Sequence, residues 1–88
     1  MPIYVVETYL TRAQGPGRQA GEDRARAAAA ELTRESTTVR FEFAMHVPED
    51  ELCFFVFDAP SPRLAALAAQ RSGLDPICVV EAVTTERK

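Results

Sequence analysis

One histidine and a run of three acids lie close together in this sequence and have the chemistry of a divalent-metal site. His46 is followed, after a Val-Pro pair, by Glu49, Asp50 and Glu51. Imidazole nitrogens and carboxylate oxygens both bind divalent ions, but one imidazole makes no strong site, so water or a second chain would have to add donors. The alternative interpretation is an exposed acidic turn beside a titratable histidine, because exposed turns are usually charged.

Two further acids, Glu7 and Glu81, each interrupt an otherwise apolar segment. Both segments are predicted to be strands that neighbour each other in one sheet, so the two carboxylates are candidates for an acidic pair. Such a pair suits acid–base chemistry or metal binding. The alternatives are an ion pair with Arg40 or Arg63, or exposure at a sheet edge, since buried acids normally have partners.

The two cysteines, Cys53 and Cys78, are predicted to lie on strands that the first strand separates, so we expect no disulfide between them. Their default role is that of small buried apolar side chains. A thiol beside an imidazole is the arrangement that activates nucleophilic cysteines, and His46 is the chain's single histidine. The hypothesis of a catalytic dyad therefore depends on whether His46 meets Cys53.

The turn between residues 38–47 and residues 51–58 decides this question. A two-residue turn at Glu49-Asp50 places His46 opposite Cys53, whereas a three-residue turn at 48–50 sends the two side chains to opposite faces. Cross-strand matching favours the three-residue turn and predicts no dyad and no catalytic group. The pairs that favour it are Phe41–Phe57, Phe43–Phe55 and Arg40–Asp58.

Three glycines, Gly15, Gly17 and Gly21, suggest a phosphate-binding loop between a strand and a helix. Their spacing does not match the dinucleotide fingerprint, and no Gly-Lys-Ser/Thr follows. Arg12 and Arg18 lie beside the start of the predicted helix and could hold an anion, although this signal is generic. We therefore interpret the segment as a connecting loop.

The elements that position these residues follow from periodicity and from Gly, Pro and Ser signals. Their order predicts a ferredoxin-like α+β fold, βαββαβ, with four antiparallel strands, both helices on one face, and the first and third strands central. The whole forms one domain, residues 1–84, with a polar tail at 85–88. The predicted strands are 3–10, 38–47, 51–58 and 76–84, and the predicted helices are 18–35 and a second one capped by Ser61 and ended by Gly73.

Several of these strands are apolar on both faces, although the helices cover only one. A second apolar face needs a cover, and a symmetric homodimer is the commonest one. We therefore expect the sheet to dimerise through the face that the helices leave open. The side chains expected at the dimer face or in the core are Tyr4, Val6, Phe54, Val56, Ile77 and Val79.

Composition limits the partners further. The net charge of −3 and the pI near 5.1 argue against nucleic acid or an anionic membrane as a partner. No apolar run approaches the ~20 residues of a membrane span, and the start of the chain carries no signal-peptide pattern. We expect a cytoplasmic protein.

The segments FFVFDAP (54–60), SGL (72–74) and EAV (81–83) form one pattern with the opening MPIYVVETY, in which Glu7 is the acid of the first strand. The pattern is a strand that ends in an acid and Ala-Pro, a helix that ends in Gly-Leu, and a last strand with Glu and Val. It resembles a family of small bacterial proteins of unknown function whose characterised member is described as a nickel-binding protein. The resemblance implies a ferredoxin-like dimer that can bind a divalent ion such as Ni²⁺ and has no established enzymatic activity.

We therefore expect a non-enzymatic homodimer that holds any divalent metal weakly, at His46 and the nearby acids. The alternative is a dimeric α+β barrel that acts on or binds a small organic molecule between its sheet and helices. A void lined by Tyr4, Tyr9 and Glu81 would support this alternative. Against it stand the side chains expected to fill that space, Phe41, Phe43, Phe55 and Phe57.

Overall fold

Strands and helices follow one another in the order β-α-β-β-α-β over the residues that the computed structural model describes, 2–35 and 37–83. The tail predicted at residues 85–88 lies outside these ranges. The bounds are β1 (Ile3–Tyr9), α1 (Gly17–Arg34), β2 (Arg40–Val47), β3 (Leu52–Asp58), α2 (Pro62–Arg71) and β4 (Pro76–Ala82), with short 3-10 helices η1 (Arg12–Gln14) and η2 (Pro48–Asp50).

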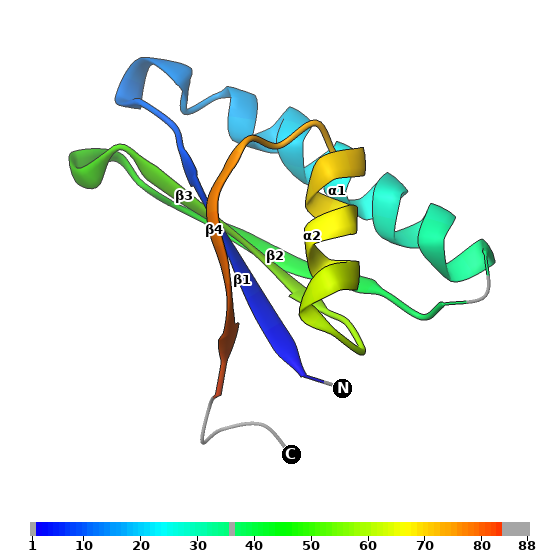
Figure 1. The fold of residues 1–88 in the computed structure, drawn as a ribbon. Helices are drawn as coiled ribbons and strands as arrows, with labels where there is room; N and C mark the ends of the chain where they lie inside the picture. The colour runs from blue at the N-terminus through cyan, green and yellow to red at the C-terminus, as the bar shows by residue number, and fades with distance from the viewer. Residues whose placement is uncertain (1, 36, 84–88) are drawn as a thin grey trace.

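The strands of the described chain form one antiparallel, four-stranded sheet in the order β2-β3-β1-β4. α1 packs mainly against β2, and α2 packs against β1 and β4, so both helices lie on the same side of the sheet (Figure 1). We call this side the helix face and the opposite side the outer face. The predicted ferredoxin-like α+β fold is confirmed.

The ends of α2 follow from local sequence signals. The Ser61 hydroxyl accepts a hydrogen bond from the Leu64 N–H, and Pro62 occupies the first turn, where a missing N–H costs nothing. After the helix, Gly73 has a φ of +72°, which favours glycine, and the Leu74 N–H donates to the Ala69 carbonyl. Both predicted ends are therefore confirmed. Neither helix in the described ranges is long and apolar enough to cross a membrane.

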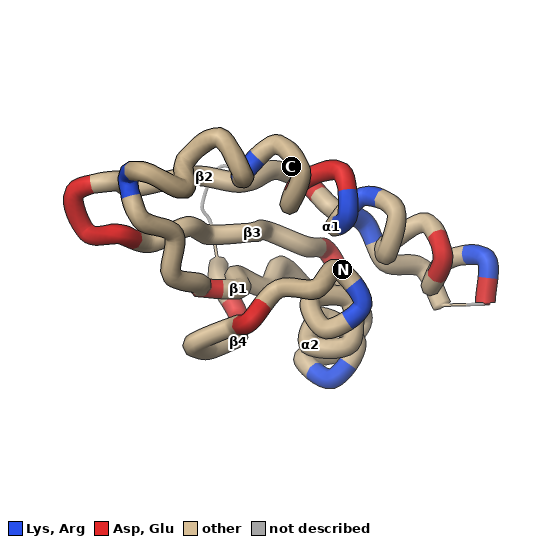
Figure 2. Tube along the Cα trace, turned by 90° about the horizontal axis from the view of Figure 1, so that it is seen from above, with Lys and Arg blue, Asp and Glu red and all other residues tan. Residues whose placement is uncertain are grey.

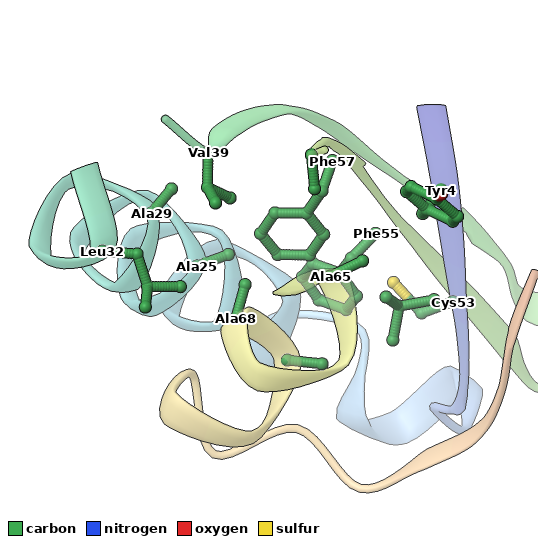
Figure 3. Close-up of a cluster of buried hydrophobic side chains, with 13 residues drawn as sticks. Tyr4, Ala25, Ala29, Leu32, Val39, Cys53, Phe55, Phe57, Ala65 and Ala68 are labelled. Atoms are coloured by element: carbon green, nitrogen blue, oxygen red, sulfur yellow. The ribbon is translucent and has the colours of Figure 1, made fainter. Parts of the chain in front are cut away.

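The core between sheet and helices combines aromatic rings from the strands with alanines from the helices (Figure 3). Phe57 is completely buried, and the Phe41 ring lies 5.4 Å from it and 6.2 Å from the Phe55 ring, centroid to centroid. Because alanine is small, the helix backbones come close to the sheet and the rings fill the remaining space. The alanines labelled in the figure are Ala25, Ala29, Ala65 and Ala68.

A β-bulge at Glu42 changes the register of the hairpin part-way along β2. Before the bulge, Arg40 pairs with Asp58 and Phe41 pairs with Phe57, as predicted. The register then shifts by one residue, because two residues of β2 occupy the place of one on β3. The side chains beyond the bulge therefore face the opposite way from a regular strand.

Beyond the bulge, Phe43 pairs with Val56 and Val47 pairs with Leu52, so the connection comprises residues 48–51 and is longer than either turn considered. The prediction that Phe43 pairs with Phe55 and fills the space under the helices is wrong. Phe43 lies on the outer face and is 52% exposed. Because this connection has an even number of residues, it pairs His46 with Cys53, as the two-residue turn would. The bulge then shifts the register by one residue, so that Phe41 still pairs with Phe57.

Phe57→Ala should remove a large part of the stability of the fold. Truncating a fully buried phenylalanine costs about 3–5 kcal/mol, against about 4–13 kcal/mol expected for a domain of this length. Urea unfolding followed by circular dichroism measures the change. Tyr9→Ala is the matched aromatic control, since that ring is 73% exposed and its loss should cost under about 1 kcal/mol. Equal effects of the two substitutions would contradict the core assignment.

Candidate functional site

His46 links the hairpin to the loop that follows β1. Its Nε2 lies 2.9 Å from the Leu10 carbonyl oxygen, and because a carbonyl only accepts, Nε2 is the donor. The Leu10 N–H in turn donates to the Glu51 carbonyl at 2.8 Å. The loop also passes close to the imidazole, because a Cβ added at Gly15 would lie 3.2 Å from His46 Cε1. The position of His46 is thus explained by contacts that hold the loop.

The three acids of the predicted metal site lie at the tip of the hairpin. Glu49, Asp50 and Glu51 are exposed, and together they form the continuous acidic segment visible there in Figure 2. Within residues 2–35 and 37–83, no three His, Cys, Asp or Glu side chains come together in a way that could hold a metal ion. The described part of one chain therefore does not fit a nickel site at His46.

His46 and Cys53 face the same side of the sheet, contrary to the sequence-based prediction. They are directly paired across β2 and β3, because the bulge at Glu42 reverses the faces that follow it. The Nε2 of His46 is nevertheless bonded to Leu10, and no hydrogen bond joins the imidazole to the Cys53 thiol in the described chain. The residues are neighbours without forming a nucleophile–base pair.

The environment of Cys53 disfavours its thiolate. The side chain is completely buried, and this burial raises the pKa of the thiol, although Arg18 nearby acts in the opposite direction. Thr8 donates its hydroxyl to the Cys53 carbonyl at 3.1 Å, which fixes the strand position. Cys53 therefore matches the predicted small buried side chain.

The structure separates the predicted acidic pair. Glu7 pairs with Cys78 across β1 and β4, whereas Glu81 pairs with Tyr4, three positions further along β4. An odd separation on a strand places the two carboxylates on opposite faces. Burial, and then the charge of Glu81, raise the pKa of the Tyr4 phenol.

Glu7 instead contacts a thiol on the outer face. The Sγ of Cys78 donates to Glu7 Oε1 at 3.5 Å. Burial first, and then this hydrogen bond and the carboxylate charge, raise the pKa of the Cys78 thiol. The sequence placed both residues on neighbouring strands, but it did not give the register that pairs Glu7 with Cys78, which runs unbroken from Ile3–Ala82 to this pair.

The side chains predicted for the dimer face or core divide between the two sides of the sheet. Phe54 and Val56 lie on the outer face, whereas Tyr4, Val6 and Val79 pack on the helix face. Ile77, at the start of β4, is 44% exposed. The outer face contains an apolar hollow of about 260 Å³, lined mainly by Ile3, Val5, Phe43, Met45, Phe54 and Val56.

A second hollow, of about 230 Å³, lies on the helix side where β1 ends, between the start of α1 and the loop before β4. It contains Tyr9 but neither Tyr4 nor Glu81, so it differs from the void considered for a barrel enzyme. Gly17, Gly21 and Arg18, which line this hollow, belong to the segment that the sequence analysis interprets as a connecting loop. The sequence gives no signal for Arg24, because only the fold brings it beside the loop before β4.

Glu7→Gln should lower the pKa of the Cys78 thiol, because it removes a negative charge that disfavours the thiolate. At any pH below the thiol pKa, the variant then carries a larger thiolate fraction. Alkylation by iodoacetamide across a pH series, read by peptide mass spectrometry, should show a lower midpoint for Cys78. Cys53 serves as the internal control and should stay slow in both proteins. An unchanged Cys78 midpoint would refute the contact.

Comparison with known proteins supports the fold. No protein-family model matches the chain, and no curated protein matches it. Among solved structures, the chain is similar to SCO4226 from Streptomyces coelicolor A3(2), with a TM-score of 0.62 and 16% sequence identity over 94% of this chain and 98% of that one. The bacterial protein and this chain thus share a ferredoxin-like fold over almost their whole lengths.

Proposed function

We propose that this chain acts as a homodimeric assembly module in which two copies pack their outer faces together. The observation that carries the proposal is the apolar outer face, which no helix in residues 2–35 or 37–83 covers. Large apolar side chains on the two edge strands of this face, β2 and β4, are half exposed, with Phe43 52%, Met45 51% and Val80 51% exposed. A sheet face that remains in water normally carries polar residues instead.

Burial of these side chains by a second copy would supply substantial free energy. Each fully buried side chain of this kind contributes about 1.5–3 kcal/mol, and the half-exposed ones retain roughly half of that amount to gain. In a two-fold symmetric pair every contact occurs twice. The total is therefore large against the marginal stability of a small domain.

The shape and charge of the outer face favour a second copy as the partner. Strands about 4.8 Å apart and seven residues long give each face a projected area of roughly 450 Å². Specific interfaces begin at about 1,000–1,200 Å² in total, so nearly the whole of both faces must be used. Aligned packing of two sheets about 10 Å apart achieves this, and it requires a flat apolar partner of equal size.

The distribution of charge favours the outer face over the other surfaces of the molecule for contact between two copies. Most charged residues in Figure 2 lie on the helices and at the hairpin tip, while the strands are largely uncharged. Two copies with a net charge of −3 would repel most through these charged surfaces and least through the outer face, where the Glu7 carboxylate accepts from the Cys78 thiol. The apolar face is thus complementary to itself.

Phe43→Glu should convert a dimer into a folded monomer, because the charge would be buried in the dimer but remains in water in the monomer. Multi-angle light scattering at tens of micromolar should give twice 9.7 kDa for the natural chain and 9.7 kDa for the variant. Circular dichroism should be the same for both. Tyr9→Glu, a charge at an exposed ring outside the outer face, is the control and should stay dimeric. A monomeric natural chain, or a dimeric Phe43→Glu variant, would refute the proposal.

The divalent ion implied by the family resemblance is not part of this proposal, since the described residues do not fit its site. We expect only weak Ni²⁺ binding, because His46 would be the single nitrogen ligand and its Nε2 is already bonded to Leu10. Calorimetric titration of Ni²⁺ into the natural chain and His46→Ala measures this. Tight binding that disappears in His46→Ala would contradict the prediction and would indicate that a second copy completes the site.

A further inference from the structure

We propose that the hollow on the helix side, bounded by Arg18, Arg24 and Phe55, binds a small organic carboxylate. We call it the arginine pocket. Its lining residues come from the end of β1, the start of α1 and the loop before β4, on the opposite side of the sheet from the outer face. Its occupation is therefore independent of dimerisation.

Two glycines on one face of α1 create the space. Gly17 and Gly21 are four residues apart, so they lie on the same side of the helix, and both line the pocket. At Gly17 an added Cβ would meet nothing within 4 Å, whereas at Gly21 it would lie 3.0 Å from Phe55 Cζ. Gly21 thus allows the helix to approach Phe55, and Gly17 leaves the adjoining space open.

Two guanidinium groups give the pocket its charge. Arg24 donates from Nε to the Ser72 carbonyl at 2.8 Å, which fixes the guanidinium against the loop before β4. In the described ranges, no carboxylate lies within ion-pair distance of Arg24. Arg18 has a long contact of 3.9 Å with Glu22, compared with 2.6 Å between Arg71 and Glu31, and the Arg18 side chain remains 44% exposed. Both arginines therefore retain N–H groups that can bind a ligand anion.

The groups that line the pocket in the described chain carry a positive balance, because Arg18 and Arg24 outnumber the carboxylate among them, Asp75. Glu22 contacts Arg18 from outside this lining. The positive end of α1, which has no acid in its first turn, adds to the guanidinium charges. A single negative charge on a ligand would offset this balance, and the planar arginine fork matches the geometry of a carboxylate.

The uncharged side chains that line the pocket indicate the chemistry of the rest of the ligand. Leu10, Phe55 and Leu74 are apolar, so the part of the ligand away from the arginines should be apolar as well. The volume of about 230 Å³ corresponds to roughly seven or eight water molecules at liquid density. The fitting class is a small aromatic or branched monocarboxylate, smaller than most drug-sized ligands.

Titration with benzoate, followed by ¹H–¹⁵N correlation spectra of the full chain, tests this proposal. Benzoate should shift amide signals around Gly17, Arg24 and Leu74 in a saturable way. Benzyl alcohol, which has a similar ring and no charge, should bind at least ten-fold more weakly. Arg18→Gln should weaken benzoate binding several-fold, and the fold should tolerate it, because the Arg18 side chain is 44% exposed.

Gly17→Leu provides the steric test, since Gly17 lines the pocket and an added Cβ there would meet nothing within 4 Å. This variant should lose benzoate binding at least ten-fold, while Ala20→Leu, on the exposed side of the same turn, should bind like the natural chain.

Three results would each overturn the proposal. They are the lack of a saturable shift up to 20 mM benzoate (roughly the limit of weak binding), equal benzoate binding by Gly17→Leu and the natural chain, and equal binding of benzyl alcohol and benzoate. Light scattering on the same samples reports the dimer separately, so failure of one proposal does not imply failure of the other.

Discussion

One extra residue in β2, Glu42, determines which side chains of that strand face the helices. Without the bulge, a strand that begins with Phe41 under α1 would also turn Phe43 and Met45 toward the helices. With the bulge, those two side chains join Phe54 and Val56 on the outer face, and His46 turns toward the loop after β1. The apolar outer face and the fixed position of the single histidine therefore have the same cause.

The helix side depends on a different constraint, the small size of the residues on α1 and α2. Alanine and glycine bring the helix backbones close to the sheet, and the rings of Phe41, Phe55 and Phe57 fill the centre. The guanidinium of Arg26 lies 5.3 Å from the Phe41 ring centroid and covers the outer edge of this cluster. Close packing ends where α1 begins, and there the missing glycine side chains leave the arginine pocket.

Much of the fold could be predicted from the sequence, because each element carries its own local signals. The caps of α2, the alternating strands and the order of the elements each follow from interactions within a few residues. The faces of β2 could not be predicted this way, because two registers each satisfy part of the hairpin. Phe41–Phe57 pairing belongs to one register and His46–Cys53 pairing to the other, and only a bulge allows both.

The candidate sites were harder to predict than the fold, because their contacts join residues that are far apart in the sequence. The acids near His46 are adjacent in sequence but extend from an exposed tip, and Glu7 and Glu81 point to opposite faces. Arg24 and Ser72, in contrast, are 48 residues apart and share a hydrogen bond. Residue spacing does not reveal contacts of that kind, because they arise only when α1 and the end of α2 pack together.

The bond between His46 and Leu10 has a consequence for local opening of the molecule. The Leu10 carbonyl accepts from His46 Nε2, and the Leu10 N–H donates to the Glu51 carbonyl, so both backbone groups of Leu10 are satisfied by the hairpin. The loop after β1 cannot detach without breaking these contacts. It therefore opens together with the hairpin as one cooperative unit, although the two segments are far apart along the chain.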